Sequence, residues 1–253
     1  MSLVIAVYVP EGIVMASDSR QSVTVEGKAP EGKSFKVETV NSDAITKTFL
    51  LEKHQIGISN FGQDLLSGVP IASLVKRFIE EALAPGDNVE TVPRKLVDYF
   101  RKSFPNADVG FHVAGYKKEG KSSVPYIYSC HVSRNDVGRR NIKPDGSLSY
   151  GAAWSGQTDI LTSILIPVVA KDEKGNDKVI RSPAPIIWDA MALQDAIDFA
   201  IYAIRTTIDT MRFQARPKNV GGPIDVLVLT PEEAKWIQMK ELHGSMLEQH
   251  GID

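Results

Sequence analysis

Short apolar runs separated by turn residues open the chain and predict a β-hairpin. Residues 3–9 and 13–18 are rich in Val and Ile, and the turn-forming segment 10–12 lies between them. The following segment, 21–44, is polar, with several Lys, Glu, Gly and Ser residues. It predicts a loop or an irregular hairpin.

A second strand pair and then two helices follow from the same pattern. Residues 45–51 and 55–61 predict the strands. Apolar residues then recur at helical spacing over 71–82, and again up to Phe104 after a break at 85–87.

The second half of the chain repeats this order of strands followed by helices. Its expected elements are strands at 108–117 and 125–133, a short strand ending near Trp154, a helix from about 155 to 169, a loop at 171–187, a helix at 191–211, a strand at 224–229 and a terminal helix from about 231.

These elements predict an α+β fold. A four-layer αββα sandwich, with two antiparallel sheets flanked by helix pairs, would bury every one-sided apolar face. The length of 253 residues fits one domain, so we expect 1–253 to be a single unit with a terminal helical extension from about 231.

Composition and charge exclude several classes of protein. Hydrophobic residues make up 43% of the chain, charged residues 24%, and the net charge of -2 gives no reason to expect nucleic acid or an anionic membrane as a partner. The single cysteine, Cys130, suits a reducing cytoplasm. The basic patch Arg139-Arg140 is most often a solvated loop. No apolar stretch approaches the roughly 20 residues of a membrane span, so we expect a soluble cytoplasmic protein.

Metal and cofactor sites find no support in the residue pattern. Cys130 and His131 are adjacent, so in a strand they point to opposite faces and cannot form a dyad. His243 and His250 are expected on an exposed terminal helix, where a solvated role is the simpler interpretation. We expect neither a metal nor a cofactor.

The start of the chain carries the candidate chemistry. Once Met1 is removed, Ser2 has a free α-amine, and such a residue combines nucleophile and base. Asp18 ends the returning strand of the predicted hairpin, close to Ser2. Each has an ordinary alternative, because serine after the initiator Met is common and Asp18 could be a turn residue.

Further motifs follow in order along the chain. They are Lys47 before an apolar strand, Ile56 to Gln63 ending around Gly62, Trp154-Ser155-Gly156, and Gly221-Gly222 before the last apolar strand. Together with Ser2 and Asp18, from residue 1 to about 235, they resemble the proteasome β-subunit family of N-terminal-nucleophile (Ntn) hydrolases, as in a bacterial or archaeal proteasome homologue. The resemblance implies the Ntn hydrolase fold.

The resemblance also implies a catalytic role for five residues. Ser2 would attack an amide or ester carbonyl and form an acyl-enzyme. Lys47, held by Asp18, would favour the alkoxide, and the backbone N–H of Gly62 would donate to the oxyanion. Ser155 would help to hold a water near the terminal amine.

Two departures from the family pattern and two alternatives stay open. Serine stands where the family has threonine, and the acidic residue expected shortly before Gly221 is absent from 214–220. Lys28, Lys33 or Lys36 could be the neighbour of the nucleophile in place of Lys47. Ser155 could simply cap the following helix.

The functional hypotheses differ in what Ser2 does. The first is a proteasome-like peptidase acting on peptides or unfolded proteins inside a homo-oligomeric ring or spiral. An unfolding ATPase is a possible further partner that the sequence does not decide. The second is a noncatalytic assembly subunit in which Met1 is retained. The third is a small-amide hydrolase with the same nucleophile, since fold does not fix substrate.

Overall fold

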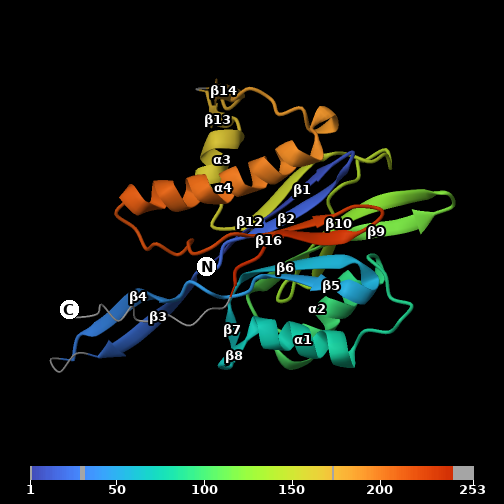
Figure 1. Cartoon of the computed structure of the whole chain (residues 1–253). Coiled ribbons are helices and arrows are strands. Elements are labelled where there is room, and N and C mark those ends of the chain that lie inside the picture. Colours follow the sequence, from blue (N-terminus) through green and yellow to red (C-terminus); the bar gives the residue numbers. More distant parts are fainter. Residues whose placement is uncertain (1, 29–31, 173, 242–253) are drawn as a thin grey trace, which may run out of the picture.

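The computed structural model describes residues 2–28, 32–172 and 174–241. Two five-stranded antiparallel sheets lie face to face, helices pack on their outer faces, and two-stranded hairpins extend from them (Figure 1).

The first large sheet contains both ends of the described chain. Its strands run in the order β12 (Gly151–Gly156), β1 (Leu3–Val9), β2 (Gly12–Ser17), β15 (Asp225–Leu229) and β16 (Ala234–Gln238). The predicted hairpin at the start of the chain is confirmed, with Ala6 of β1 opposite Met15 of β2. Both strands are buried along their whole length, which explains why they are apolar at almost every position.

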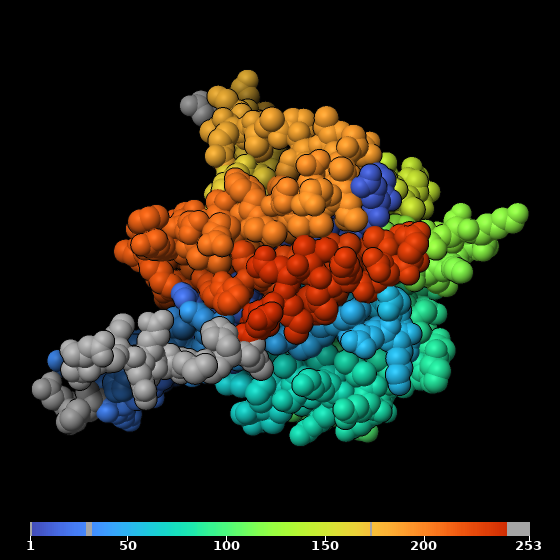
Figure 2. All heavy atoms as spheres, viewed as in Figure 1, coloured from blue at the N-terminus to red at the C-terminus, as the bar shows by residue number. Residues whose placement is uncertain are grey.

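The second large sheet forms from the middle of the chain. Its strands run in the order β11 (Asp136–Arg139), β10 (Ser122–His131), β9 (Val109–Glu119), β6 (Ile56–Gly62) and β5 (Thr48–Leu51). A short 3₁₀ turn, Glu52–His54, joins β5 to β6. The long β9–β10 hairpin projects beyond the sheet on the right of the space-filling view (Figure 2).

Side chains of β1 point in turn to the helices on one side and to the second large sheet on the other. Leu3, Ile5 and Val7 pack against helices α3 (Asp159–Leu165) and α4 (Leu193–Phe213). Ala6 and Tyr8 point the other way and join a core between the two large sheets. Successive side chains of a strand point to opposite faces, so one strand serves two cores.

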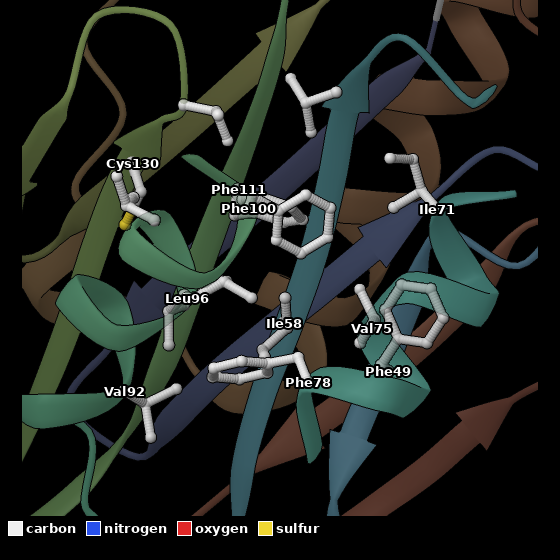
Figure 3. Close-up of a cluster of buried hydrophobic side chains, with 14 of the residues drawn as sticks. Phe49, Ile58, Ile71, Val75, Phe78, Val92, Leu96, Phe100, Phe111 and Cys130 are labelled. Carbon is white, nitrogen blue, oxygen red and sulfur yellow. The ribbon is translucent and has the colours of Figure 1, made fainter. Parts of the chain in front are cut away.

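Helices α1 (Ile71–Glu81) and α2 (Thr91–Ser103) cover the outer face of the second large sheet. Their apolar positions recur every three to four residues and form one buried stripe. Figure 3 shows Phe78 and Phe100 against the strand residues Ile58 and Phe111. The ring centroids of Phe100 and Phe111 are 5.0 Å apart.

The expected four-layer αββα sandwich built from only two sheets is wrong for this chain. The described structure is mostly β, with 41% strand and 25% helix, and it contains five sheets. The three additional sheets are two-stranded: β3 (Gln21–Lys28) with β4 (Ser34–Ser42), β7 (Leu65–Leu66) with β8 (Val69–Pro70), and β13 (Val168–Lys171) with β14 (Asp177–Arg181).

The β3–β4 pair confirms the irregular-hairpin alternative predicted for 21–44, whereas the β13–β14 hairpin was not predicted. Both strands of β13–β14 are exposed throughout, so no buried face imposes an alternation of apolar and polar residues. The expected helix from about 155 to 169 is also shorter, and ends at Leu165. Pro167 follows, and Ile166 before it is extended.

The expected terminal helix from about 231 is wrong over the described residues, because β16 occupies 234–238 there. The rest of that segment, with His243 and His250, lies outside the described residues. A second 3₁₀ turn, Trp188–Ala190, precedes α4. No helix within 2–28, 32–172 and 174–241 is long and apolar enough to cross a membrane.

Candidate active site

Ser2 lies at the start of β1 and is fully buried. The Asp18 carboxylate accepts a hydrogen bond from the backbone N–H of Leu3 at 2.9 Å, and the Leu3 carbonyl accepts one from the Asp18 N–H at 3.2 Å. The Ser2 carbonyl accepts a hydrogen bond from the N–H of Gln157 at 2.7 Å. The peptide unit between Ser2 and Leu3 is therefore held by the segments that directly follow β2 and β12.

Asp18 and Lys47 form an ion pair with both side chains 0% exposed. Lys47 Nζ lies 2.9 Å from Asp18 Oδ1 and also donates to the backbone carbonyl of Arg20. Asp18 Oδ2 accepts from the N–H groups of Arg20 and Gly221, each at 3.1 Å. Burying two charges is tolerated here because the carboxylate and ammonium share several hydrogen bonds.

The other candidate lysines lie elsewhere. Lys28 and Lys36 belong to the β3–β4 hairpin, where Lys36 pairs with Glu26 at 2.8 Å on the surface. Lys33 immediately precedes β4. Among these lysines, Lys47 is the one in contact with Asp18.

Two glycines permit close backbone approaches at the edge of the site. Gly62 has φ of +95°, and a Cβ there would lie 2.2 Å from the carbonyl oxygen of Asp108. Gly156 has φ of +99°, and a Cβ there would lie 1.8 Å from the Ser2 carbonyl oxygen. A side chain at either position would clash with backbone.

Ser155 belongs to β12, opposite Val4 of β1. Its hydroxyl makes no hydrogen bond to Ser2 among the described residues. The helix-cap alternative is wrong, because α3 begins at Asp159 with Thr158 in the N-cap position. Ser155 instead faces the pocket that contains Ser2.

Three of the expected site residues line one pocket of about 410 Å³, which we call the Ser2 pocket. Its walls come from β6, β10 and β12, from Ser2 just before β1, and from residues outside the strands. The lining includes Ser2, Gly62, Ser155, Trp154, His131 and Arg134. The chain thus gathers segments that are far apart in sequence, while Asp18 and Lys47 support the backbone without lining the pocket.

Asp64 was not expected at the site. Its Oδ1 accepts a hydrogen bond from Ser2 Oγ at 3.4 Å, and its Oδ2 has no partner among the described residues. Burial raises the pKa of Asp64, while the Lys47 charge opposes that rise. The available sequence signal was a carboxylate two positions after Gly62, which alone is too common to indicate a site.

Cys130 and His131 do not form a catalytic pair. The Cys130 thiol belongs to the core under α2, and burial raises its pKa to about 12, so it stays protonated. His131 Nε2 lies 3.2 Å from Asp108 Oδ1, and burial and the Arg134 charge lower the His131 pKa. Within 2–28, 32–172 and 174–241, no cluster of three His, Cys, Asp or Glu residues could hold a metal ion.

Solved structures with a similar fold include two proteins called Anbu. One is an Anbu mutant from Hyphomicrobium sp. strain MC1, with a TM-score of 0.55 and 14% identity, over 95% of this chain and 86% of that one. Another is Anbu, described as an ancestral beta-subunit, from Yersinia bercovieri, with a TM-score of 0.52 and 14% identity, over 93% and 86%. No family model matches the chain, and no curated protein matches it. The likeness establishes the fold alone.

The assignment to the proteasome β-subunit family is therefore corrected. The similar structures belong to Anbu, which is proteasome-like but a distinct family. The motifs around Gly62, Gly156 and Gly221 mark strand ends where backbones approach closely. Such positions indicate an arrangement of strands and do not distinguish families that share it.

Replacing Lys47 should destabilise the protein strongly. Lys47→Met keeps the length of the side chain but leaves the Asp18 carboxylate buried without a counter-charge, so we expect a loss of about 3–5 kcal/mol in the free energy of unfolding. Urea denaturation measures it. Lys36→Met, which removes an exposed pair, should change little, and Asp18→Asn combined with Lys47→Met should recover part of the loss. If Lys47→Met and Lys36→Met lowered the free energy of unfolding equally, a structural role for the buried pair would be contradicted.

Proposed function

We propose that this chain hydrolyses amide or peptide bonds with Ser2 as an N-terminal nucleophile, after removal of Met1. The observation that carries the proposal is the buried Asp18–Lys47 pair, which fixes the backbone of Leu3 directly after Ser2. A strand that only completes a sheet has no need of a desolvated ion pair at its first residue, since such pairs are costly to bury.

Activation of Ser2 would use its own amine and the nearby charges. The α-amine has a reference pKa of about 7.7–8.0, so part of it is neutral near pH 7 and can accept the hydroxyl proton. In the resting site the Asp64 carboxylate accepts the hydroxyl hydrogen bond and orients Oγ, and the hydroxyl turns towards the amine when its proton is transferred. Lys47 acts through its positive charge, and no hydrogen bond joins it to Ser2 among the described residues.

The reaction would proceed through an acyl-enzyme. Ser2 Oγ forms a bond to the substrate carbonyl carbon while its proton moves to the α-amine. The oxyanion would be held at Gly62, where the absence of a side chain allows substrate to approach the backbone. The C–N bond then breaks, the amine leaves with the proton, and water releases the acyl group from Ser2.

Peptides or unfolded proteins are the substrates that this proposal favours, since polar and aromatic side chains line the Ser2 pocket. The described similarity is to an ancestral beta-subunit, which supports a homo-oligomer as the working assembly. An ATPase that delivers unfolded chains remains a prediction. A small amide is the alternative substrate, because the fold does not fix the ligand.

The second candidate function is a noncatalytic assembly subunit. Complete burial of Ser2 favours it, because a nucleophile must be reached by substrate. In that case Met1 is retained and Ser2 is an ordinary strand residue.

Substitution of Ser2 separates these functions. Ser2→Ala should lower turnover of a fluorogenic peptide or ester by at least about a thousandfold, because no nucleophile remains. Ser2→Thr keeps both hydroxyl and amine and should retain turnover well above that of Ser2→Ala. The measurement is initial rate with purified, correctly folded variants. Turnover that survives in Ser2→Ala would contradict the nucleophile assignment.

The acid side of the pH profile should report Asp64. Only its carboxylate form accepts the Ser2 hydrogen bond as a charged acceptor, and burial raises its pKa. Activity therefore falls as pH drops through that raised pKa, in addition to the fall caused by protonation of the amine. Below both pKa values, log(kcat/KM) should change with a slope of about two, and Asp64→Asn should reduce the slope to about one.

The control is Asp145→Asn, which changes a carboxylate in an exposed loop. It should keep the slope of about two. An unchanged slope in Asp64→Asn would show that this carboxyl group does not act on the reaction.

A further inference from the structure

A second cavity adjoins the Ser2 pocket, in the gap between the two large sheets. We call it the inter-sheet cavity. Its volume is about 410 Å³, within the range of about 300–1,000 Å³ typical of ligand sites. Phe61, Arg134 and Trp154 line both cavities, so the two cavities adjoin one another. The polar lining residues of the inter-sheet cavity include Tyr8, His112, Ser129, Arg134, Asp136 and Arg140.

Two arginines of this lining keep their hydrogen-bond donors available. The guanidinium groups of Arg134 and Arg140 make no hydrogen bond or ion pair within the described residues. Arg139 differs, since its Nε donates to Asn141 Oδ1 at 3.1 Å and its guanidinium lies 3.5 Å from the ring centroid of Tyr126. Arg139 therefore supports the strand, whereas Arg134 and Arg140 are free to bind an anion.

The charge of Arg140 acts on the groups inside the cavity. It opposes the rise that burial causes in the pKa of Tyr8, and it adds to the fall in the pKa of His112. An arginine that only extended into solvent beside an exposed loop would not influence both walls of the cavity in this way.

His112 adds a buried ring nitrogen without a partner among the described residues. Its side chain is 1% exposed, Ser129 Oγ lies 2.9 Å from its Nδ1, and its Nε2 has no partner among the described residues. Burial and the Arg140 charge lower its pKa to about 4, so the ring is neutral near pH 7. Two tautomers fit this contact; in the one with the ring proton on Nε2, Nδ1 accepts from the Ser129 hydroxyl and the Nε2–H has no acceptor among the described residues.

We propose that the inter-sheet cavity binds a carboxylate of the peptide substrate through Arg134, Arg140 and His112. The proposal rests on the proposed function, because the cavity is a subsite next to Ser2. Arginine presents paired N–H groups that match a carboxylate. With Asp136 in the lining, the charged groups sum to one positive charge, which suits a carboxylate better than a doubly charged phosphate.

The test uses two matched peptide pairs. One pair is capped at both ends and differs only by Glu or Gln next to the scissile bond, while the other is neutral and differs only by a free acid or an amide at its C-terminus. Binding is measured by titration calorimetry on Ser2→Ala, and kcat/KM on the unmodified protein. In at least one pair, the peptide with the carboxylate should be preferred about tenfold. The pair that shows the preference identifies whether the bound carboxylate is a side chain or the C-terminus.

Arg140→Met should reduce that preference to less than about threefold, in binding as well as in kcat/KM. Arg205→Met, which removes an exposed arginine of α4, should leave it unchanged. Absence of preference in both pairs, no binding of any peptide, or an unchanged preference in Arg140→Met would overturn the subsite. Preferential binding to Ser2→Ala without turnover by the unmodified protein would support the subsite while rejecting the proposed function.

Discussion

The buried ion pair between Asp18 and Lys47 is the constraint on which the site depends. Asp18 accepts hydrogen bonds from the backbone N–H groups of Leu3, Arg20 and Gly221, so one carboxylate joins the start of β1 to the segments that follow β2 and precede β15. Lys47 neutralises it from the segment leading into β5, in the second large sheet. The pair therefore connects the two large sheets beside Ser2, which directly precedes β1.

Much of the fold could be predicted because buried faces impose a periodic pattern on the sequence. The strands of 3–9 and 13–18 and the helix starting at Ile71 are examples. The β3–β4 and β13–β14 hairpins lack that pattern because they are largely exposed, and one of them was mistaken for a loop. The strand at 234–238 was mistaken for a helix because its residues alternate only weakly.

The residues of the candidate site also differ in whether the sequence could predict them. Ser2, Gly62 and Ser155 lie at strand ends that sequence order could align, and the structure brings them to one pocket. Asp64 could not be found this way, because its importance comes from burial beside Ser2 and an oxygen without a partner. Such features depend on packing between segments and leave no local signal in the sequence.

The most direct test of the account is the intact mass of the protein after treatment with a peptide epoxyketone. This electrophile closes a ring over both the hydroxyl and the α-amine of an N-terminal residue, so it reacts only with an uncapped nucleophile. The account predicts a mass without Met1 plus one adduct, and no adduct in Ser2→Ala. A mass that retains Met1 and carries no adduct would contradict it.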